Sequence, residues 1–209
     1  MALLDGSVEP EAIHRADQSA IENSCNLNVE TAVSVDYSSK ARKLVLQGGE
    51  ALFTVAHNKR RPFTVTAGAV TVTATGTRFD VARRENRISV ALIEGSVVVR
   101  TGNGPTVRLR PGQQWRSSDA RMSVRTVKAD AVTAWTQGRV IFDDARLTDA
   151  LAEINRYGGK LIVLDAARRI SGSFEAGDTD NFVTAVTTFL PLRQSWTHLI
   201  AQDRTHEKK

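Results

Sequence analysis

The stretch that decides the fold is residues 44–99, which read LVLQGGEALFTVAHNKRRPFTVTAGAVTVTATGTRFDVARRENRISVALIEGSVVV. Short runs of alternating apolar and polar residues are divided there by turns rich in Gly, Asn and Arg. The apolar positions of one such run are Val65, Ala67, Val70, Val72 and Ala74, and beside them stand Thr64, Thr66, Thr71, Thr73 and Thr75. A period of two residues is typical of strands. The stretch therefore predicts a β-domain of short strands, and because no reactive side chain recurs among them, we expect a scaffold for contact.

Strands of this kind are expected from Leu44 to Val127, at the short, turn-separated spacing of all-β folds. Positive-φ corners are expected at the small residues between them: Gly48–Gly49, Asn58, Gly68, Gly76, Asn86, Gly95 and Gly102–Gly104. Residues 13–35 show only a weak pattern. The spacing fits a sandwich, a barrel or a solenoid-like stack, and periodicity alone does not choose among them.

Beyond this region the pattern changes to one that mixes strands and helices. Residues 140–142 predict a short strand, and Asp143 or Asp144 is expected to cap a helix. The apolar residues of that helix recur at spacings of three and four residues: Leu147, Ala150, Leu151 and Ile154. Gly158–Gly159 should end it, and residues 161–164 predict a buried strand, so the unit is βαβ.

The same unit is predicted a second time. Residues 170–174 form its first strand, and Asp178 or Asp180 caps its helix. The apolar residues of this helix are Phe182, Val183, Val186, Phe189 and Leu190. Pro191 should stop the helix, and residues 194–200 predict one final strand.

The predicted fold is therefore mainly β plus α+β, in two domains. Residues 1–132 should form an all-β domain, solenoid-like or a sandwich, and residues 133–209 a small module of two βαβ repeats. A chain of 209 residues, 41% hydrophobic and 24% charged, has the composition of folded globular protein. It contains no apolar run of the roughly 18 residues that a membrane helix needs.

The net charge of +5 lies entirely in residues 1–132, which hold 18 Lys and Arg against 13 Asp and Glu. Nucleic-acid binding would need clustered cations interleaved with aromatic residues. The basic clusters at residues 59–61 and 83–84 lie instead in predicted turns, so we expect no nucleic-acid partner. Attraction to an anionic membrane surface stays open.

No catalytic, cofactor or metal constellation is predicted. Asp143 and Asp144 are explained by helix capping rather than by acid–base chemistry. The four histidines are scattered, without the spacing of a zinc site: His14, His57, His198 and His206. Cys25 has no disulfide partner and is interpreted as a small buried apolar residue. The protein is therefore predicted not to be an enzyme.

Several spaced motifs carry a family resemblance: residues 49–56 (GEALFTVA), 61–65 (RPFTV), 76–81 (GTRFDV), 94–99 (EGSVVV) and 111–113 (PGQ). In this order they resemble the periplasmic domain of FecR-type sigma regulators, over about residues 26–114. A second match, in residues 134–142 and 147–157, resembles the carboxy-terminal part of the same regulators. That part is similar to the signalling (STN) domain at the front of secretins and some TonB-dependent transporters.

The resemblance implies a sensor in transmembrane signalling. A transporter loaded with ferric siderophore presents its signalling domain in the periplasm, and the regulator's outer portion binds that domain. The change then releases or activates an extracytoplasmic-function sigma factor through a cytoplasmic part that this chain lacks. The parent protein would be a single-pass inner-membrane protein with this portion in the periplasm. Residues 1–10, with two acidic residues and no long apolar core, do not resemble a secretory signal peptide.

The C-terminal module is expected to dock its partner by strand addition at an unpaired sheet edge. Candidate contact residues are Trp196 and Leu199 on the last strand, and Ile170 and Phe174 on the strand that opens the second repeat. Burial against the neighbouring helix explains Trp196 and Leu199 equally well. Trp135 is expected to pack the two domains together.

A second class of function stays open, a cell-surface or polysaccharide-binding β-scaffold without a sigma factor. It requires a groove lined by exposed aromatic residues, for which the β-domain offers Phe53, Phe63, Phe79 and Trp115.

Overall fold

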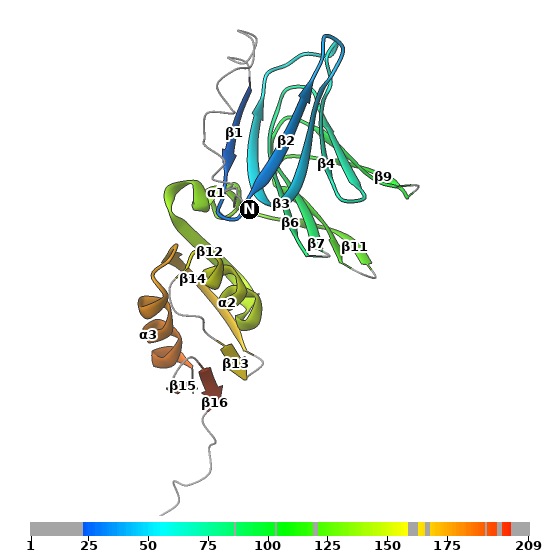
Figure 1. Ribbon diagram of the computed structural model, residues 1–209. Helices are drawn as coiled ribbons and strands as arrows, with labels where there is room; N and C mark the ends of the chain where they lie inside the picture. The colour runs from blue at the N-terminus through cyan, green and yellow to red at the C-terminus, as the bar shows by residue number, and fades with distance from the viewer. Residues whose placement is uncertain are drawn as a thin grey trace, which may run out of the picture.

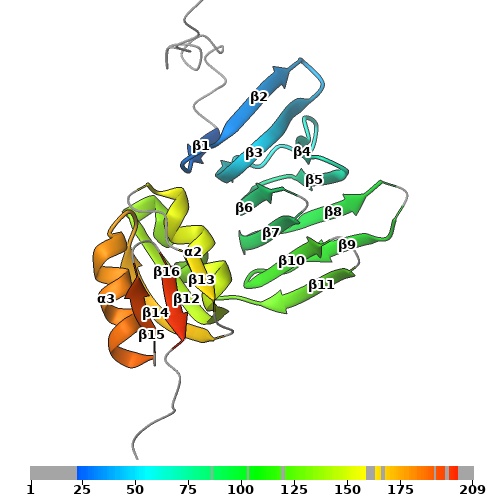
Figure 2. The same ribbon diagram turned by 60° about the horizontal axis from the view of Figure 1, so that its bottom comes forward.

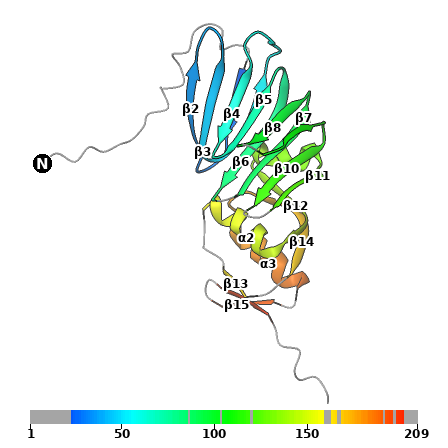
Figure 3. The same ribbon diagram turned by 90° about the vertical axis from the view of Figure 1, so that its right-hand side faces the viewer.

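The computed structural model describes residues 23–85, 87–102, 104–118, 121–158, 163–165, 168–190, 192–195 and 198–201. The described elements fall into two parts, which lie end to end in all three views (Figures 1 to 3). The first part, called here the β-part, holds β1–β11, and the second part runs from α1 to β16. The protein is mostly β, as its sequence predicts.

The β-part is one curled sheet of eleven strands. Its main path has the order β11-β10-β7-β6-β3-β4-β5-β8-β9, and β1 and β2 both pair with β3. The bounds of the strands are β1 Asn23–Leu27, β2 Ala32–Tyr37, β3 Arg42–Val55, β4 Phe63–Ala67, β5 Val70–Ala74, β6 Thr77–Arg84, β7 Arg87–Glu94, β8 Val97–Thr101, β9 Thr106–Leu109, β10 Gln113–Ser118 and β11 Arg121–Thr126. Neighbouring strands are antiparallel except β3 and β4. Figure 3 shows the sheet in the upper half of the view, with the second part below it.

The long strand β3 allows the sheet to curl because its two halves pair with different strands. Its first half pairs with β2 and β4, and its second half pairs with β1 and β6. Gly49 lies at the change, with a φ of +85°, and a Cβ there would come within 2.3 to 2.6 Å of Thr31 and Glu30. Only glycine accommodates this close approach. The Gly48–Gly49 pair is therefore a bend inside one strand, not the corner between two strands that the sequence predicts.

The two halves of the curled sheet enclose one apolar core. Phe53, Phe63 and Phe79 lie at its centre, with ring centroids 5.3 to 6.3 Å apart. Trp115 is 1% exposed and belongs to the same core. The alternating residues of β4 and β5 are buried and half-buried in turn, as the period of two predicts. Two sheet halves that share one core resemble a sandwich more than a solenoid.

Two features of the β-part differ from the sequence analysis. Strands β1 and β2 lie in the region whose pattern is weak, because as strands at the edge of the sheet they are largely exposed and need little apolar alternation. Cys25 on β1 is exposed, so its interpretation as a buried apolar residue is wrong. It faces Phe53 across the β1–β3 pair but lies at the uncovered rim of the sheet.

The second part places two helices against two small sheets. Its helices are α1 Ala129–Thr133, the 3₁₀ helix η3 Ala134–Gln137, α2 Leu147–Arg156 and α3 Thr179–Phe189. Its strands are β12 Arg139–Arg146, β13 Val163–Asp165, β14 Arg169–Glu175, β15 Leu192–Ser195 and β16 His198–Ala201. One sheet pairs β12 with β14, antiparallel, and the other has the order β13-β16-β15. α2 contacts β12 and β13, and therefore touches both sheets.

The pairing expected of two βαβ repeats is not confirmed. The strands on either side of α2 lie in different sheets, and each pairs with a strand from the other half of this part. The single strand predicted over residues 194–200 is instead two short antiparallel strands, β15 and β16, with Ser195 opposite His198. A reversal of direction there was not visible in the periodicity, because each strand has only four residues.

A second core lies between these helices and the β12–β14 sheet. Its buried residues include the predicted positions of α2, which are Leu147, Ala150, Leu151 and Ile154. From α3 it includes Phe182, Val183 and Val186, but Phe189 is 84% exposed. Phe189 is the last residue of α3, where the helix has passed the edge of the core.

The predicted cap of α2 is wrong, whereas that of α3 is confirmed. Asp143 and Asp144 belong to β12, which bulges between Phe142 and Ala145. The carboxylate of Asp144 accepts a hydrogen bond from Arg169 Nε at 2.6 Å, so it serves the β12–β14 pair. Asp178 caps α3, since its Oδ1 accepts from the Asn181 N–H at 3.0 Å. Gly158 has a φ of +90° just after α2, as predicted, while Gly159 and Pro191 lie outside the described residues.

Candidate functional site

The predicted contact residues are only partly described. Ile170 and Phe174 lie on β14, are half-buried and pack against the second core. The ring of Phe174 meets that of Phe182 edge to face at 4.9 Å. Leu199 lies on β16, where the structure describes the backbone alone, and Trp196 lies outside the described residues. These four residues remain predictions as a partner-binding set.

The aromatic residues of the β-part do not form a binding groove. Phe53, Phe63, Phe79 and Trp115 are all buried in the first core. The four aromatic residues on which the polysaccharide-binding alternative relied are therefore not available to line a groove.

The outer face of the curled sheet carries a second buried patch where the two parts meet. Leu52, Asp80 and Ala91 are direct neighbours across β3, β6 and β7, and all three are buried. Their side chains point away from the first core, because the residues next to them in each strand, such as Phe53 and Phe79, point into it. The start of the second part lies against this face, where α1 contacts β7.

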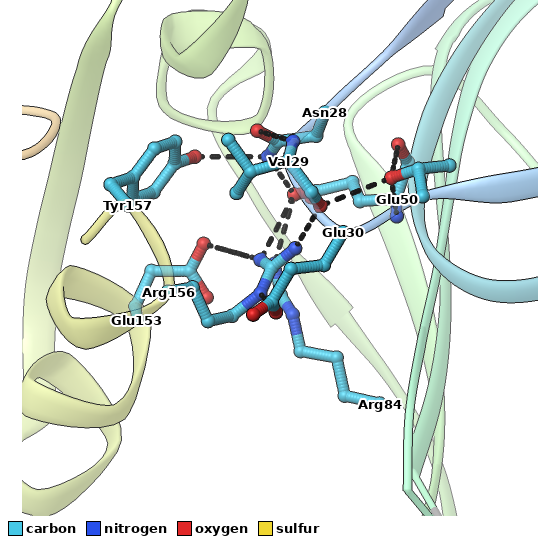
Figure 4. A network of polar contacts seen from close by, with 9 residues as sticks. Asn28, Val29, Glu30, Glu50, Arg84, Glu153, Arg156 and Tyr157 are labelled. Atoms are coloured by element: carbon cyan, nitrogen blue, oxygen red, sulfur yellow. Dashed lines mark hydrogen bonds and ion pairs between the residues drawn. The ribbon is translucent and has the colours of Figure 1, made fainter. Parts of the chain in front are cut away.

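A network of charged side chains joins the same face to α2 (Figure 4). Arg84 on β6 donates from one nitrogen to Glu50 on β3 at 2.8 Å and to Glu153 on α2 at 3.0 Å. Arg156 donates to the same Glu153 oxygen at 3.0 Å. Charged groups with so little exposure are stable only when they are paired in this way. Arg84 therefore acts as a bridge between the β-part and the second part.

The turn between β1 and β2 is held by the same network. Asn28 is buried and donates from Nδ2 to Glu50 at 2.6 Å and to the hydroxyl of Tyr157 at 2.9 Å. Arg156, whose side chain is only 12% exposed, donates to the carbonyl of Val29 at 2.9 Å. Its guanidinium also lies 3.5 Å from the carboxylate of Glu30. Residues separated by about 130 positions in the chain are thus tied together (Figure 4).

Asp80 lies beside this network and is 2% exposed. Burial raises the pKa of Asp80 well above its usual range, and the charge of Glu50 raises it further. Arg84 and the indole of Trp135 act in the opposite direction. Among the described residues, neither Asp80 Oδ2 nor Trp135 Nε1 has a hydrogen bond of ordinary geometry. The buried carboxyl of Asp80 therefore keeps its proton to a higher pH than an exposed carboxyl would.

The pKa of Glu50 is also raised. Burial raises its pKa, while Arg84 and the hydrogen bond from Asn28 lower it. A more exposed pair, Arg87 with Asp149 at 3.3 Å, lies at the rim of the junction. Exposed pairs of this kind contribute little to stability. The residues of the less exposed contacts are called here the junction network: Asn28, Glu50 and Asp80, which are buried, and Arg84, Glu153 and Arg156, which are half-buried.

The junction network was not predicted from the sequence, apart from the expectation that Trp135 joins the two domains. Asp80 alternates with apolar residues along β6, which predicts an exposed outer face. The only sequence signal was that Glu50 and Asp80 both fall within otherwise apolar runs. Their burial depends on a second layer that covers the sheet, and a strand pattern does not contain that information.

The arrangement is suited to holding two protein surfaces together. The carboxyl groups converge, but the guanidinium groups of Arg84 and Arg156 fill the space between them. Within the described ranges, no group of three or more His, Cys, Asp and Glu could hold a metal ion. No helix in this described portion is both long enough and apolar enough to span a bilayer.

The fold and the junction define a class of protein: a mainly β contact scaffold joined by a polar junction to a small α+β part. Residues 16–98 match the family described as FecR protein. This match covers the part of the chain that carries the spaced motifs, so residues 16–98 are similar to the FecR family, in agreement with the resemblance that the sequence shows.

Solved structures support the same fold over most of the chain. Two crystal structures of a "putative anti-sigma factor" from Parabacteroides distasonis ATCC 8503, at 1.65 and 2.50 Å resolution, are similar to it. Each has a TM-score of 0.74 and 22% sequence identity, and the alignment covers 87% of this chain and 91% of that chain. No curated protein matches the chain.

Proposed function

We propose that this chain is the periplasmic sensor part of a transmembrane sigma regulator, an anti-sigma factor. Its FecR region, combined with a fold similar to that of a protein described as an anti-sigma factor, is the observation that carries the proposal. Sigma regulation would use a cytoplasmic part of the parent protein. In this role the chain binds a protein signal and performs no chemistry.

We further propose that residues 1–132 and 133–209 act as separate domains. Two separate apolar cores support this division, one in the curled sheet and one around α2 and α3. The first domain carries the family motifs, and the second is the candidate for receiving the signal.

The partner proposed for the second domain is the N-terminal signalling domain of an outer-membrane TonB-dependent transporter, which reports uptake of ferric siderophore. Strand β14 offers a means of contact, since its described pairing is with β12 only, so one edge carries unpaired backbone groups. A partner strand can complete such a ladder. Ile170 and Phe174 would then lie beside the added strand, with Trp196 and Leu199 as further candidates.

Phe189 is an additional candidate for the contact. It is the most exposed of the large apolar side chains among the described residues, at 84%, and lies at the end of α3. An exposed aromatic residue on a small module is a typical anchor for a partner.

Calorimetric titration of the full chain with the purified signalling domain of the transporter tests the proposal. We expect binding with a dissociation constant in the micromolar range or below, about −8 kcal/mol or stronger. Phe189→Ser should weaken it at least about tenfold. Val35→Ser is the matched control, because it removes an exposed apolar side chain from the β-part, on β2. Absence of heat at high micromolar concentrations of both proteins would contradict the proposed partner.

A further inference from the structure

The junction network contains more negative than positive charge. Three of its residues are acids, namely Glu50, Asp80 and Glu153, and only Arg84 and Arg156 are cations among them. If all three acids were ionised, one negative charge would stay uncompensated in a site with little access to water. Such a charge is costly, and one bound proton removes it.

The contacts indicate which acid holds the proton. Glu50 accepts hydrogen bonds from Arg84 and Asn28, and Glu153 accepts from Arg84 and Arg156. Asp80 receives no hydrogen bond from either arginine among the described contacts, and its Oδ2 has no partner. The groups that shift the pKa of Asp80 are Glu50 from β3, Arg84 from β6, Trp135 from η3 and Glu153 from α2, and the charge of Asp80 in turn raises the pKa of Cys25 on β1. Two of the acids that surround it are already paired, so Asp80 is the group that stays neutral.

Both the burial of Asp80 and part of the charge around it come from the second part. Trp135 on η3 and Glu153 on α2 belong to that part, whereas Asp80 and Glu50 belong to the sheet. Separation of the two parts would remove the negative charge of Glu153 and admit water to the outer face of β6. Asp80 would then ionise in the ordinary range of a carboxyl group.

We propose that the junction is a proton-dependent latch, in which the two parts close with uptake of one proton by the Asp80–Glu50 pair and separate when that proton is lost. The closed form binds more protons than the open form, so acid favours closure and rising pH favours opening. The pH range over which closure weakens starts at the usual pKa of a carboxyl group and extends upward to the raised pKa of Asp80 in the closed form. The latch is a property of this chain alone and does not depend on the identity of any partner.

Hydrogen exchange of the full chain, measured between about pH 5 and pH 9 and corrected for the intrinsic rate, tests the latch. The backbone amides of η3 and of the β1–β2 turn should exchange at least about tenfold faster at the alkaline end. The amides of β4 and β5 in the first core and of α3 in the second should stay protected. Small-angle scattering should show a larger radius of gyration over the same window.

Asp80→Asn is the decisive variant, because the amide has the shape of the carboxyl group but no charge to lose. We expect it to stay closed across the whole window, with the alkaline acceleration reduced to less than about twofold. Asp149→Asn is the matched control on α2, since Asp149 is exposed at the rim and pairs only with Arg87 among the described contacts. It should keep the pH dependence of the unchanged chain.

Equal protection of η3 at both ends of the window in the unchanged chain overturns the proposal. So does an alkaline opening that persists in Asp80→Asn. Should that variant fail to fold, the pH dependence of the unchanged chain and of Asp149→Asn decides. These outcomes are distinct from the failure of transporter binding, because no partner is present.

Discussion

Gly76 lies at the corner between β5 and β6 with a φ of +122°, a conformation that other residues rarely adopt. A Cβ at this position would lie 2.7 to 2.9 Å from three atoms of His57, one of which is its Cα. Because the backbone of His57 is involved, rotation of the imidazole cannot relieve the contact. His57 is exposed, and its backbone packs against Gly76, which belongs to one of the spaced motifs.

Replacement of this glycine tests the steric argument. Gly76→Ala should lower the free energy of unfolding by about 2 kcal/mol, since it combines backbone strain with an overlap. Gly48→Ala is the matched control, because a Cβ there meets nothing within 4 Å. Urea unfolding of both variants gives the comparison, and equal stability of the two would contradict the argument.

Cys25 shows that an exposed position does not guarantee a reactive side chain. Desolvation raises the pKa of its thiol to about 12, and the charge of Asp80 acts in the same direction. The exposure of Cys25 favours reaction, whereas the raised pKa of its thiol opposes it. The pKa decides, because only the thiolate attacks an alkylating reagent.

Alkylation kinetics test this conclusion. At about pH 8 the folded protein should react with iodoacetamide at least about 100-fold more slowly than the urea-unfolded protein, since so little thiolate is present. Mass spectrometry of the modified peptide measures both rates. A folded rate close to the unfolded one would show that the thiol is fully solvated.

At the scale of elements, the two long helices of the second part begin in different ways. The first N–H of α2 donates to the carbonyl of Arg168 at 2.8 Å, so a backbone group from the segment before β14 satisfies it. The start of α3 relies on the side chain of Asp178. A capping carboxylate satisfies an otherwise unpaired N–H and interacts favourably with the helix dipole.

The difference predicts unequal effects of two similar substitutions. Asp178→Ala should destabilise the second part by about 1 kcal/mol through loss of the cap. Asp143→Ala removes a carboxylate that the sequence suggested as a cap, yet it should cost less than about 0.5 kcal/mol. Thermal unfolding followed by circular dichroism compares them. A larger loss in Asp143→Ala would restore the original capping assignment.

At the scale of the whole molecule, the two cores have no buried residue in common and meet through the junction network. The contact between them includes the charged junction network as well as the apolar residues Leu52 and Ala91, whereas each core is apolar. Interfaces of this kind are compatible with motion between parts that each stay folded. This combination is compatible with the proposed role, in which a contact made at one end of the molecule is felt at the other.

A substitution in one core should therefore leave the other intact. Phe182→Ala removes a buried ring that contacts Phe142 and Phe174, and should cost the second part about 3 to 5 kcal/mol. Calorimetry should show this part unfolding in a separate, earlier transition, with the strands of the first core still protected from hydrogen exchange. A single transition that includes both parts would contradict the division into two domains.

The sequence by itself determined the strands of residues 44–127, the buried face of α2 and the resemblance to the FecR family. These depend on local periodicity and on spaced motifs, which each residue carries wherever it lies in space. The predictions that failed also had local causes. Strands β1 and β2 were missed because edge strands show little apolar alternation. Asp143 and Asp144 do not cap α2 because they lie at the bulge of β12. Only the tertiary structure decided that Asp80 and Glu50 are buried against α2 and that Phe189 is exposed. The physical reason is that burial of an outer strand face depends on which distant element covers it, and that information lies in the packing of the two parts.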